Sequence, residues 1–420
     1  MGPRFSIVYP TRNRPEFVRQ ALRILEAQGY DDFQVVVSDN YLDPALSCEA
    51  ICRETSVANV TYVRPPRPVG MVENWNYSLK FATGDYLLYL TDKMFVLPGA
   101  LASLARAIDA AAGPDIVSWT SDAYHPASFE DYLGYGVYVP VSPAVRSGRF
   151  RPYSPAAELD RRGRAAVSRG EQSSADYGRG KLVFGAYRRD LVDRIVRRYG
   201  ALFSDINPDY TSMILGLTEA RHAIELGMSC VVSLNTDISN GQLSDTDDAA
   251  AWRFLESLAG GTERILPALL VPGLYVSQHN WVAHDFLSLK RAFDLPFEFD
   301  AANWIVYVIE DVRRPGRRWS DPRVEAEQKA VLGTFLESLE PALAATVEAR
   351  LAARAAPALA PPSVRRSARS VVHRLLRPSW RRSLRALVPE PWRRRTPWTA
   401  RSIEQAALSK RDRPGEMLRT

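Results

Sequence analysis

The stretch FSIVYPTRNRPE, residues 5–16, shows how this chain begins to fold. Its apolar run, Phe5–Tyr9, is typical of a buried strand. The polar loop Pro10–Arg14 follows, and Pro15 can then occupy the first turn of a helix, where a missing N–H has no intrahelical partner to lose. The sequence therefore predicts a strand, a charged loop and a helix over Glu16–Ala27.

The same alternation of strand and helix patterns continues over the first 120 residues. Further apolar runs predict strands at Gln34–Ser38, Val60–Val63, Tyr86–Leu90 and Ile116–Thr120. Amphipathic segments between the strands predict helices at Ala45–Arg53, Val72–Phe81 and Gly99–Ala112. Such alternation favours an α/β, Rossmann-like fold with a mostly parallel sheet and helices on both faces.

Ligands of such sheets bind beyond the carboxyl ends of the strands. This rule directs attention to the loops Pro10–Arg14, Asp39–Asp43, Arg64–Gly70 and Thr91–Met94. Residues 122–180 are rich in Tyr, Pro, Gly, Ser and Arg without a steady period, so we expect mobile loops that face a substrate there. Downstream patterns predict helices at Arg188–Tyr199, Tyr210–Leu226 and Val324–Ala355, the last interrupted at Pro341, and a strand at Ser229–Leu234.

The composition is that of an ordinary globular protein, with 46% hydrophobic and 24% charged residues. The formal net charge of +6 is unevenly spread. Residues 361–420 hold 16 Lys and Arg against 4 Asp and Glu, which leaves 38 against 44 in the first 360 residues. Because the excess of positive charge lies near the C-terminus, the sequence argues against a nucleic-acid-binding protein.

The sequence shows no pattern of a secretory signal peptide before the first strand. The longest uncharged stretch, Ile265–Ala283, contains two prolines and a polar run. A membrane-spanning helix needs about 20 mostly apolar residues, so we interpret this stretch as buried or loop structure. Three cysteines, Cys48, Cys52 and Cys230, form no metal-type cluster and no even disulfide framework. We therefore expect a protein of the reducing cytoplasm.

Four motifs occur in the order and spacing of one known enzyme family. They are SIVYPTRNRPE at 6–16, VSDN at 37–40, GMVENWNYSL at 70–79 and ATGDYLLYLTDK at 82–93. Together they resemble the GT-A glycosyltransferases of family 2, well over residues 4–110 and more loosely over 181–240. The resemblance implies the GT-A fold and an enzyme that uses a nucleoside-diphosphate sugar as its donor.

The resemblance assigns the donor site to residues that suit a diphosphate and a nucleoside. A diphosphate needs backbone N–H groups and cations near its oxygens, and the loop before the first helix offers both. Asp39 can accept hydrogen bonds from a nucleoside, although strand-end acids also serve as turn residues. Two asparagines carry amides that can reach the sugar or base, or cap a helix. The expected donor set is Pro10, Thr11, Arg12, Asn13, Arg14, Glu16, Asp39, Asn40, Asn74, Asn76 and Thr91.

The segment Thr91–Met94 departs from the family pattern. In the family, carboxylates at this place hold Mg²⁺ or Mn²⁺ against the diphosphate. Asp92 matches the first acidic position, and Lys93 stands where a metal ligand is expected. A lysine repels a nearby cation, but its ammonium can contact the diphosphate directly. Three alternatives follow: Lys93 replaces the metal, Asp92 holds a metal as the only carboxylate, or the metal site is lost and Lys93 is solvated.

The acceptor half of the family is resembled by GKLVFG at 180–185 and SDINPDY at 204–210. Asp209 opens a helical pattern, as the family's catalytic carboxylate does. An inverting transfer needs one base that takes the proton of the acceptor hydroxyl. Asp209 is the candidate base, with a helix cap as its alternative role, and Asp205 is the second candidate.

Two histidines, His279 and His284, could supply a phosphate or metal contact, but a hydrogen-bonded core residue is the more common role. The C-terminal segment repeats apolar residues at helical spacing among arginines, with tryptophans after them. Over residues 363–400 this pattern predicts either attachment to an anionic membrane surface or a helix packed on the acidic body. We expect three parts: a GT-A catalytic domain over 1–240, a mostly helical part over 241–356 that completes the acceptor side, and a basic, Trp-containing amphipathic tail over 357–420.

The leading hypothesis is an inverting glycosyltransferase that moves a sugar from a nucleoside-diphosphate sugar to a hydroxyl-bearing glycan, lipid-linked or natural-product acceptor. A first alternative is an enzyme of this fold that transfers something other than a sugar. A second alternative is a non-catalytic binding protein with a degenerate pocket. The expected partners are the donor and the acceptor, in the cytoplasm or at the inner face of its membrane.

Overall fold

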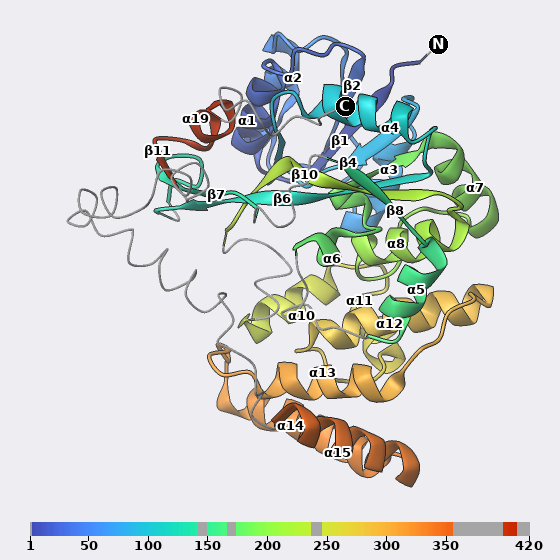
Figure 1. The fold of residues 1–420 in the computed structure, drawn as a ribbon. Coiled ribbons are helices and arrows are strands. Elements are labelled where there is room, and N and C mark those ends of the chain that lie inside the picture. Colours follow the sequence, from blue (N-terminus) through green and yellow to red (C-terminus); the bar gives the residue numbers. More distant parts are fainter. Residues whose placement is uncertain are drawn as a thin grey trace, which may run out of the picture.

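The computed structural model describes residues 2–128, 130–141, 149–165, 174–236, 246–355 and 398–409 (Figure 1). Within these residues, eleven strands form a single sheet. Helices cover the sheet on both faces, as the strand and helix patterns predict. The α/β fold class is therefore confirmed.

The first four strands run parallel in the order β3, β2, β1, β4. Val8 of β1 lies opposite Val36 of β2 and Tyr89 of β4. Because these strands are parallel, the loops that follow β1 and β4 leave the sheet at the same edge. The bounds are β1 Phe5–Thr11, β2 Phe33–Asp39, β3 Val60–Val63 and β4 Tyr86–Tyr89.

The remaining strands extend the sheet beyond β4 and make it a mixed one. β9 pairs antiparallel with both β4 and β6, and β6 pairs parallel with β10. β5 pairs with β10, which holds the segment after β4 at the edge of the sheet. The bounds are β5 Met94–Val96, β6 Ile116–Pro126, β7 Gly136–Val139, β8 Phe150–Tyr153, β9 Gly185–Arg188 and β10 Ala223–Leu234.

Alternate residues of one strand enter two different cores. Phe5, Ile7 and Tyr9 face a core that includes α1, α2 and α4. Val8 faces a core that includes α3, α7 and α8. This period of two explains why a continuous apolar run makes a strand buried on both faces. The helices are α1 Pro15–Leu25, α2 Glu49–Glu54, α3 Met71–Leu79, α4 Ala100–Ala110, α7 Arg189–Tyr199 and α8 Pro208–Glu219.

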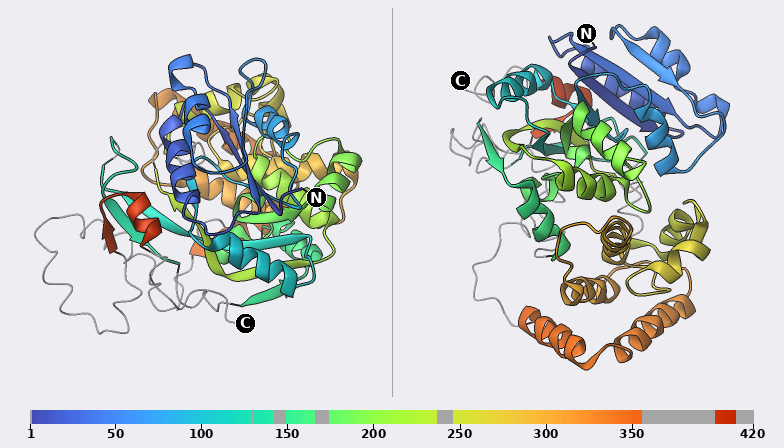
Figure 2. Two further views of the ribbon diagram at one scale, coloured as in Figure 1. Left: turned by 90° about the horizontal axis from the view of Figure 1, so that it is seen from above. Right: turned by 90° about the vertical axis from the view of Figure 1, so that its right-hand side faces the viewer.

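Residues 246–355 form a helical layer beside the sheet (Figures 1 and 2). This layer has a third core, in which Trp281 packs with Ile305 and Val308. α14 and α15, separated near Pro341 as predicted, lie farthest from the sheet (Figure 2). The bounds are α10 Asp248–Glu256, α11 Gly261–Ile265, α12 Gln278–Phe293, α13 Ala301–Arg313, α14 Pro322–Glu337 and α15 Pro341–Ala355.

Two predicted segments differ from the structure. The helix predicted up to Leu226 ends at Glu219, and β10 begins at Ala223, which pairs with Ile116 of β6. The described part of 122–180, predicted as loops, contains the end of β6, strands β7 and β8, and the helices α5 Pro155–Gly163 and α6 Ser174–Gly178. Pairing with distant strands decides both regions, and a local pattern does not contain that information. No helix in the described ranges is long and apolar enough to cross a membrane.

The C-terminal end of the described chain returns to the sheet. β11 Trp398–Ala400 pairs antiparallel with β7, and α19 Ile403–Leu408 packs on α1 (Figure 2). The ring of Trp398 stacks on Tyr138 with a centroid distance of 4.2 Å. Trp398 therefore packs on the folded body, which agrees with the second of the two predicted alternatives for this residue and not with a membrane-facing position. Residues 363–397 of that predicted surface lie outside the described residues.

We expect Ile403→Ala to lower the melting temperature by about 3–6 °C, because Ile403 is fully buried in the core that α1 also enters. Arg401→Ala, which changes an exposed side chain two residues earlier, is the matched control and should leave the melting temperature nearly unchanged. Differential scanning calorimetry measures both. Equal melting temperatures for the two variants would show that α19 does not stabilise the folded protein.

Candidate active site

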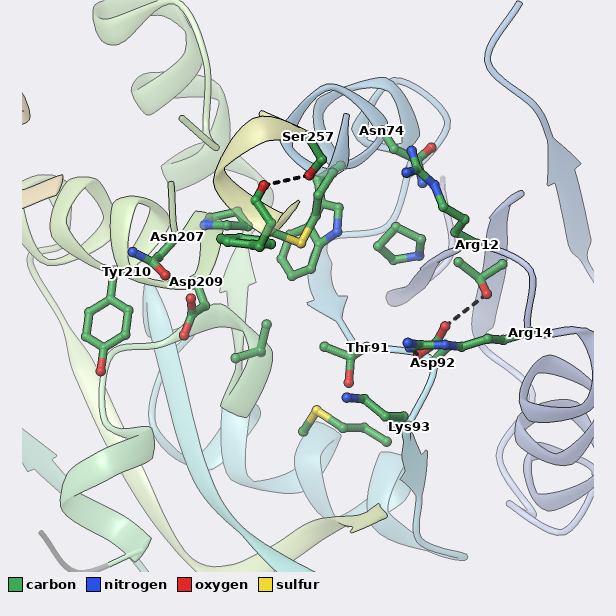
Figure 3. Close-up of a pocket in the computed structure, with 18 of the residues that line it drawn as sticks. Arg12, Arg14, Asn74, Thr91, Asp92, Lys93, Asn207, Asp209, Tyr210 and Ser257 are labelled. Carbon is green, nitrogen blue, oxygen red and sulfur yellow. Dashed lines mark hydrogen bonds and ion pairs between the residues drawn. The ribbon is translucent and has the colours of Figure 1, made fainter. Parts of the chain in front are cut away.

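A cleft of about 660 Å³ opens at the carboxyl ends of β1 and β4 (Figure 3). Its walls come from the loops after these strands, from the starts of α3 and α8, and from α10 and α12. The sheet and the helical layer thus each contribute one side. Ten of the predicted site residues line the cleft: Pro10, Thr11, Arg12, Arg14, Asn40, Asn74, Thr91, Asp92, Lys93 and Asp209.

Three predicted residues near the cleft have structural contacts instead of lining it. Asn13 has a φ of 56°, and its Oδ1 accepts a hydrogen bond from the backbone N–H of Leu42 at 2.8 Å, so it shapes a turn. Glu16 lies at the surface beside an arginine of its own helix. Asn76 joins α3 to the backbone of Phe203 through hydrogen bonds of 2.7 and 3.3 Å.

Asp39 is fully buried at the end of β2 and does not line the cleft. Its Oδ2 accepts hydrogen bonds from the backbone N–H of Cys48 at 2.7 Å and from the hydroxyl of Tyr62 at 3.2 Å. Burial raises the pKa of Asp39, and these hydrogen bonds oppose the shift. Oδ1 is buried and has no hydrogen-bond partner among the described residues. Asp39 therefore supports the segment around Cys48 through Oδ2, and the predicted contact with a nucleoside stays a prediction.

Asn40 and Asn74 border the cleft, but their amides are engaged within the protein. Asn40 donates to the carbonyl of Val69 at 2.8 Å and accepts from the N–H of the same residue at 3.0 Å. Asn74 accepts a hydrogen bond from the hydroxyl of Ser38 at 2.7 Å. The two amides hold the segments around the end of β2 together, and this is a different role from the predicted contact with the sugar or base.

Asp92 is buried at the donor end of the cleft, and both of its oxygens are hydrogen-bonded. Oδ1 accepts from the guanidinium of Arg14 at 3.0 Å, and Oδ2 accepts from the hydroxyl of Thr11 at 3.0 Å. The carboxylate therefore joins the loop after β4 to the loop after β1. These are the two loops that the parallel strands place at the same edge of the sheet.

Lys93 lies beside Asp92 with its ammonium in the cleft (Figure 3). Burial lowers the pKa of Lys93 to about 8; the charge of Asp92 opposes this shift and the charge of Arg14 adds to it. The ammonium forms no hydrogen bond or ion pair with another described residue. Lys93 therefore has donors available for an anionic ligand.

The donor end of the cleft has an excess of positive charge. Among the described residues that line it, Arg12, Arg14 and Lys93 face the single carboxylate of Asp92. Arg12 donates to the carbonyl of Val69, and burial lowers its pKa. Buried or half-buried cations of this kind favour an anion with several acceptor oxygens, such as a diphosphate.

The same residues do not fit a divalent metal ion. Mg²⁺ and Mn²⁺ require several oxygen ligands, whereas Asp92 is the single carboxylate at this end of the cleft among the described residues, and each of its oxygens already accepts a hydrogen bond, from Thr11 or from Arg14. The positive charges of Lys93 and Arg14 would also repel a metal ion bound at Asp92.

Asp209 lies across the cleft from these cations (Figure 3). It is in the first turn of α8, which begins at Pro208, a residue suited to the first helical position. The N-cap position belongs to Asn207, so Asp209 is not the helix cap. Its side chain is 27% exposed, and its Oδ2 lies 3.1 Å from the ammonium of Lys181. Asp209 therefore presents a carboxylate to the cleft.

Asp205, the second candidate base, is engaged elsewhere and does not line the cleft. It accepts hydrogen bonds from Arg264 at 2.9 Å and Ser288 at 2.8 Å. Burial alone would raise the pKa of Asp205, but hydrogen bonds from His284, Arg264 and Ser288 outweigh burial and hold it well below its usual range. His279 is hydrogen-bonded to a buried aspartate. Both histidines have the core role that is the more common one.

Sequence reasoning missed most of the acceptor side of the cleft. The missed lining residues are Tyr177, Phe184, Arg253, Phe254, Ser257, Gln278 and Trp281. They come from the segment before β9 and from the helices α10 and α12. Amphipathic periodicity can locate such helices, but it does not reveal that they border a cleft formed by the N-terminal strands.

Comparison with known proteins gives two related sequence matches. Residues 6–157 match the family model of glycosyl transferase family 2. A curated relative, the GalNAc(5)-diNAcBac-PP-undecaprenol beta-1,3-glucosyltransferase of Campylobacter jejuni, is 27% identical over 105 residues, which make up 25% of this chain and 34% of the relative. The match therefore spans about a third of the relative's length.

Solved structures were also compared. S. aureus TarS 1-349 in complex with UDP-GlcNAc is 15% identical with a TM-score of 0.43, over 84% of this chain and 85% of that one. The mannosyltransferase PcManGT from Pyrobaculum calidifontis, in complex with GDP-Man and Mn²⁺, is 17% identical with a TM-score of 0.36, over 97% and 86%.

The parallel N-terminal strands and the loops after them, which line one end of the cleft, lie within the residues that match the family model. Over residues 6–157 the chain is therefore similar to glycosyl transferase family 2.

Proposed function

We propose that this protein transfers a sugar from a nucleoside-diphosphate sugar to a hydroxyl group of its acceptor, with inversion at the anomeric carbon and without a divalent metal. The arrangement of charge carries this proposal. Cations at the donor end, Arg12, Arg14 and Lys93, face the carboxylate of Asp209 across one cleft of about 660 Å³.

The two ends of the cleft suit the two bond changes of a single displacement reaction, in which one bond forms at the anomeric carbon as another breaks. Asp209 takes the proton of the acceptor hydroxyl while the hydroxyl oxygen forms a bond to the anomeric carbon. On the opposite face of the sugar, the bond from the anomeric carbon to the diphosphate breaks, and its electron pair leaves with the diphosphate. Lys93 and the two arginines stabilise the charge that develops there. Base and leaving group on opposite sides of the sugar produce inversion.

The acceptor side supports a saccharide as the acceptor. Aromatic side chains line this side, among them Tyr177, Tyr210 and Trp281, and their flat apolar faces can stack on a sugar ring. The name of the Campylobacter relative describes transfer to a glycan carried on undecaprenol diphosphate. We therefore propose a glycan acceptor, with a lipid-linked glycan as the first class to test, at the cytoplasmic face of the membrane.

A panel of UDP-, GDP-, CDP- and dTDP-sugars tests this function. Each donor is added to the full chain with EDTA, with Mg²⁺ or with Mn²⁺, and the melting temperature and the release of nucleoside diphosphate are measured. We expect one nucleotide to raise the melting temperature in EDTA, as a ligand of the native state does, and its sugar to be released or transferred. A nucleotide that binds without any turnover would support the binding-protein alternative, and the absence of both effects would contradict the proposal.

A further inference from the structure

Lys181 is a buried cation that the mechanism above does not use. It lies just before β9, in a short segment between α6 and that strand, and its side chain is 0% exposed. A buried ammonium is stable only when charged or polar groups replace its water. Three groups do so here: the Oδ2 of Asp209 at 3.1 Å, the ring of Tyr177 at 4.0 Å and the ring of Tyr210 at 3.6 Å.

The ammonium of Lys181 has three N–H donors, and three groups surround it. One donor points to a carboxylate, and the two aromatic faces attract the same cation. Burial alone would lower the pKa of Lys181, but Tyr177, Tyr210 and Asp209 outweigh burial and raise it above its ordinary value. Lys181 therefore remains a cation and is not itself a base.

The segment that carries Lys181 is held rigidly. Arg162 donates to the carbonyls of Asp176, Tyr177 and Arg179, the last at 3.0 Å. Arg162 is in turn paired with Glu158 at 2.7 Å. These contacts set the position of the backbone on the N-terminal side of Lys181.

A second contact joins this segment to α8, the helix of Asp209. The hydroxyl of Tyr187 bonds to the carbonyl of Gly180 at 2.6 Å and to that of Ser212 at 3.2 Å. Gly180 directly precedes Lys181, and Ser212 is about one turn after Asp209. The two hydrogen bonds of Tyr187 therefore hold the backbone segments that carry the two charged side chains next to each other.

The two oxygens of Asp209 are therefore not equivalent. Oδ2 is held by Lys181, whereas no described residue donates a hydrogen bond to Oδ1. The side chain lines the cleft and is partly exposed, so Oδ1 is accessible to a ligand there.

We propose that Lys181 is a positioning residue: it holds Oδ2 of Asp209 so that Oδ1 faces the acceptor hydroxyl and receives its proton. This inference rests on the proposed transferase function. It assigns a role to a residue that is not one of the reacting groups of the proposed transfer. The ammonium of Lys181 contacts the carboxylate, the rings of Tyr177 and Tyr210 lie against that ammonium, and Arg162 is a further cation that acts on Lys181.

A thermal cycle tests the pairing without any substrate. Asp209→Ala leaves the buried ammonium without its carboxylate, and we expect a melting temperature about 3–6 °C lower than wild type. Lys181→Met replaces the ammonium with an apolar chain of similar length between two aromatic rings and should change the melting temperature by less than about 2 °C. The double variant Lys181→Met/Asp209→Ala should recover most of the loss. Additive effects in the three variants would overturn the pairing.

Steady-state kinetics test the positioning by separating kcat from KM. In Lys181→Met we expect kcat to fall about tenfold or more with the donor KM unchanged, because Oδ2 of Asp209 loses the contact that holds the carboxylate in place. Lys290→Met is the control: Lys290 also contacts an aromatic ring and backbone carbonyls, but outside the cleft, so its kcat and donor KM should stay within a few-fold of wild type.

The two measurements separate the possible failures. An unchanged kcat in a folded Lys181→Met enzyme would overturn the positioning role alone. If no donor is turned over by wild type, the proposed function fails and the role of Lys181 in transfer fails with it, while the thermal cycle still decides whether Lys181 and Asp209 form a coupled pair.

Discussion

Asp209→Asn is expected to lower the rate of sugar transfer by about 10²-fold or more, the usual contribution of a general base. The amide has nearly the shape of the carboxylate but cannot accept the proton of the acceptor hydroxyl at neutral pH. Donor affinity should change little, because the cations that surround the proposed diphosphate lie at the other end of the cleft. Single-turnover transfer and donor titration by calorimetry measure the two quantities separately.

Asp205→Asn is the matched control for this experiment. Asp205 has a φ of 49°, a conformation that asparagine tolerates, and its carboxylate bonds to Arg264 and Ser288 outside the cleft. We expect this variant to lose stability and to keep a transfer rate within a few-fold of wild type. If instead Asp209→Asn keeps its rate and Asp205→Asn loses it, the base has been assigned to the wrong carboxylate.

Lys93→Ala is the second variant with a large expected effect, a loss of about 10²-fold or more in transfer rate, comparable to the loss of one contact to a developing oxyanion. Lys93 lies in the cleft without another described residue bonded to its ammonium, and both oxygens of Asp92 are occupied. Because Lys93 takes the place of a metal ion in this proposal, the wild-type enzyme should keep most of its activity in EDTA. Lys80→Ala, which changes an exposed lysine, should have a normal rate.

The pH dependence of the wild-type rate gives an independent check on Lys93. Its pKa is lowered to about 8, so the free enzyme carries the ammonium below this pH and loses it above. We therefore expect kcat/KM for the donor to fall as the pH rises through about 8. The bound diphosphate favours the charged ammonium, so the basic limb of kcat should lie at higher pH. Lys93→Ala should lack this limb.

Lys93→Asp adds a carboxylate beside Asp92 and removes the repelling charge, so we expect it to gain activity when Mn²⁺ is added. The wild-type enzyme should show no such gain. Wild-type activity that disappears in EDTA and returns with Mn²⁺ would contradict the role of Lys93, because Asp92 would then have to hold the ion with other ligands.

The donor side of the cleft could be predicted well because it is local. The run from Phe5 to Arg14 contains a strand, its end and the loop after it, and the segment around Asp92 repeats this pattern. A parallel sheet places such strand ends at one edge, so the positions of Arg14, Asp92 and Lys93 follow from periodicity and a topological rule. The hydrogen-bond partners of the side chains did not follow: the sequence does not show that Oδ2 of Asp39 binds Cys48 and Tyr62.

The acceptor side depended on contacts between distant segments. Lys181 is one of six lysines in the sequence, and only the packing of its segment on α8 brings its ammonium to Asp209. The same holds for Trp398: the sequence pattern allows a membrane surface or packing on the body, and the structure places the ring on Tyr138.

The sequence by itself determined the α/β class, the first strands and helices, and the donor loops, because hydrophobic periods and strand ends act over a few residues. The tertiary structure alone decided which carboxylate faces the cleft, what holds it, and that the C-terminal strand joins the sheet. Those outcomes depend on burial and on hydrogen bonds between residues far apart in the chain, and such contacts have no local signal.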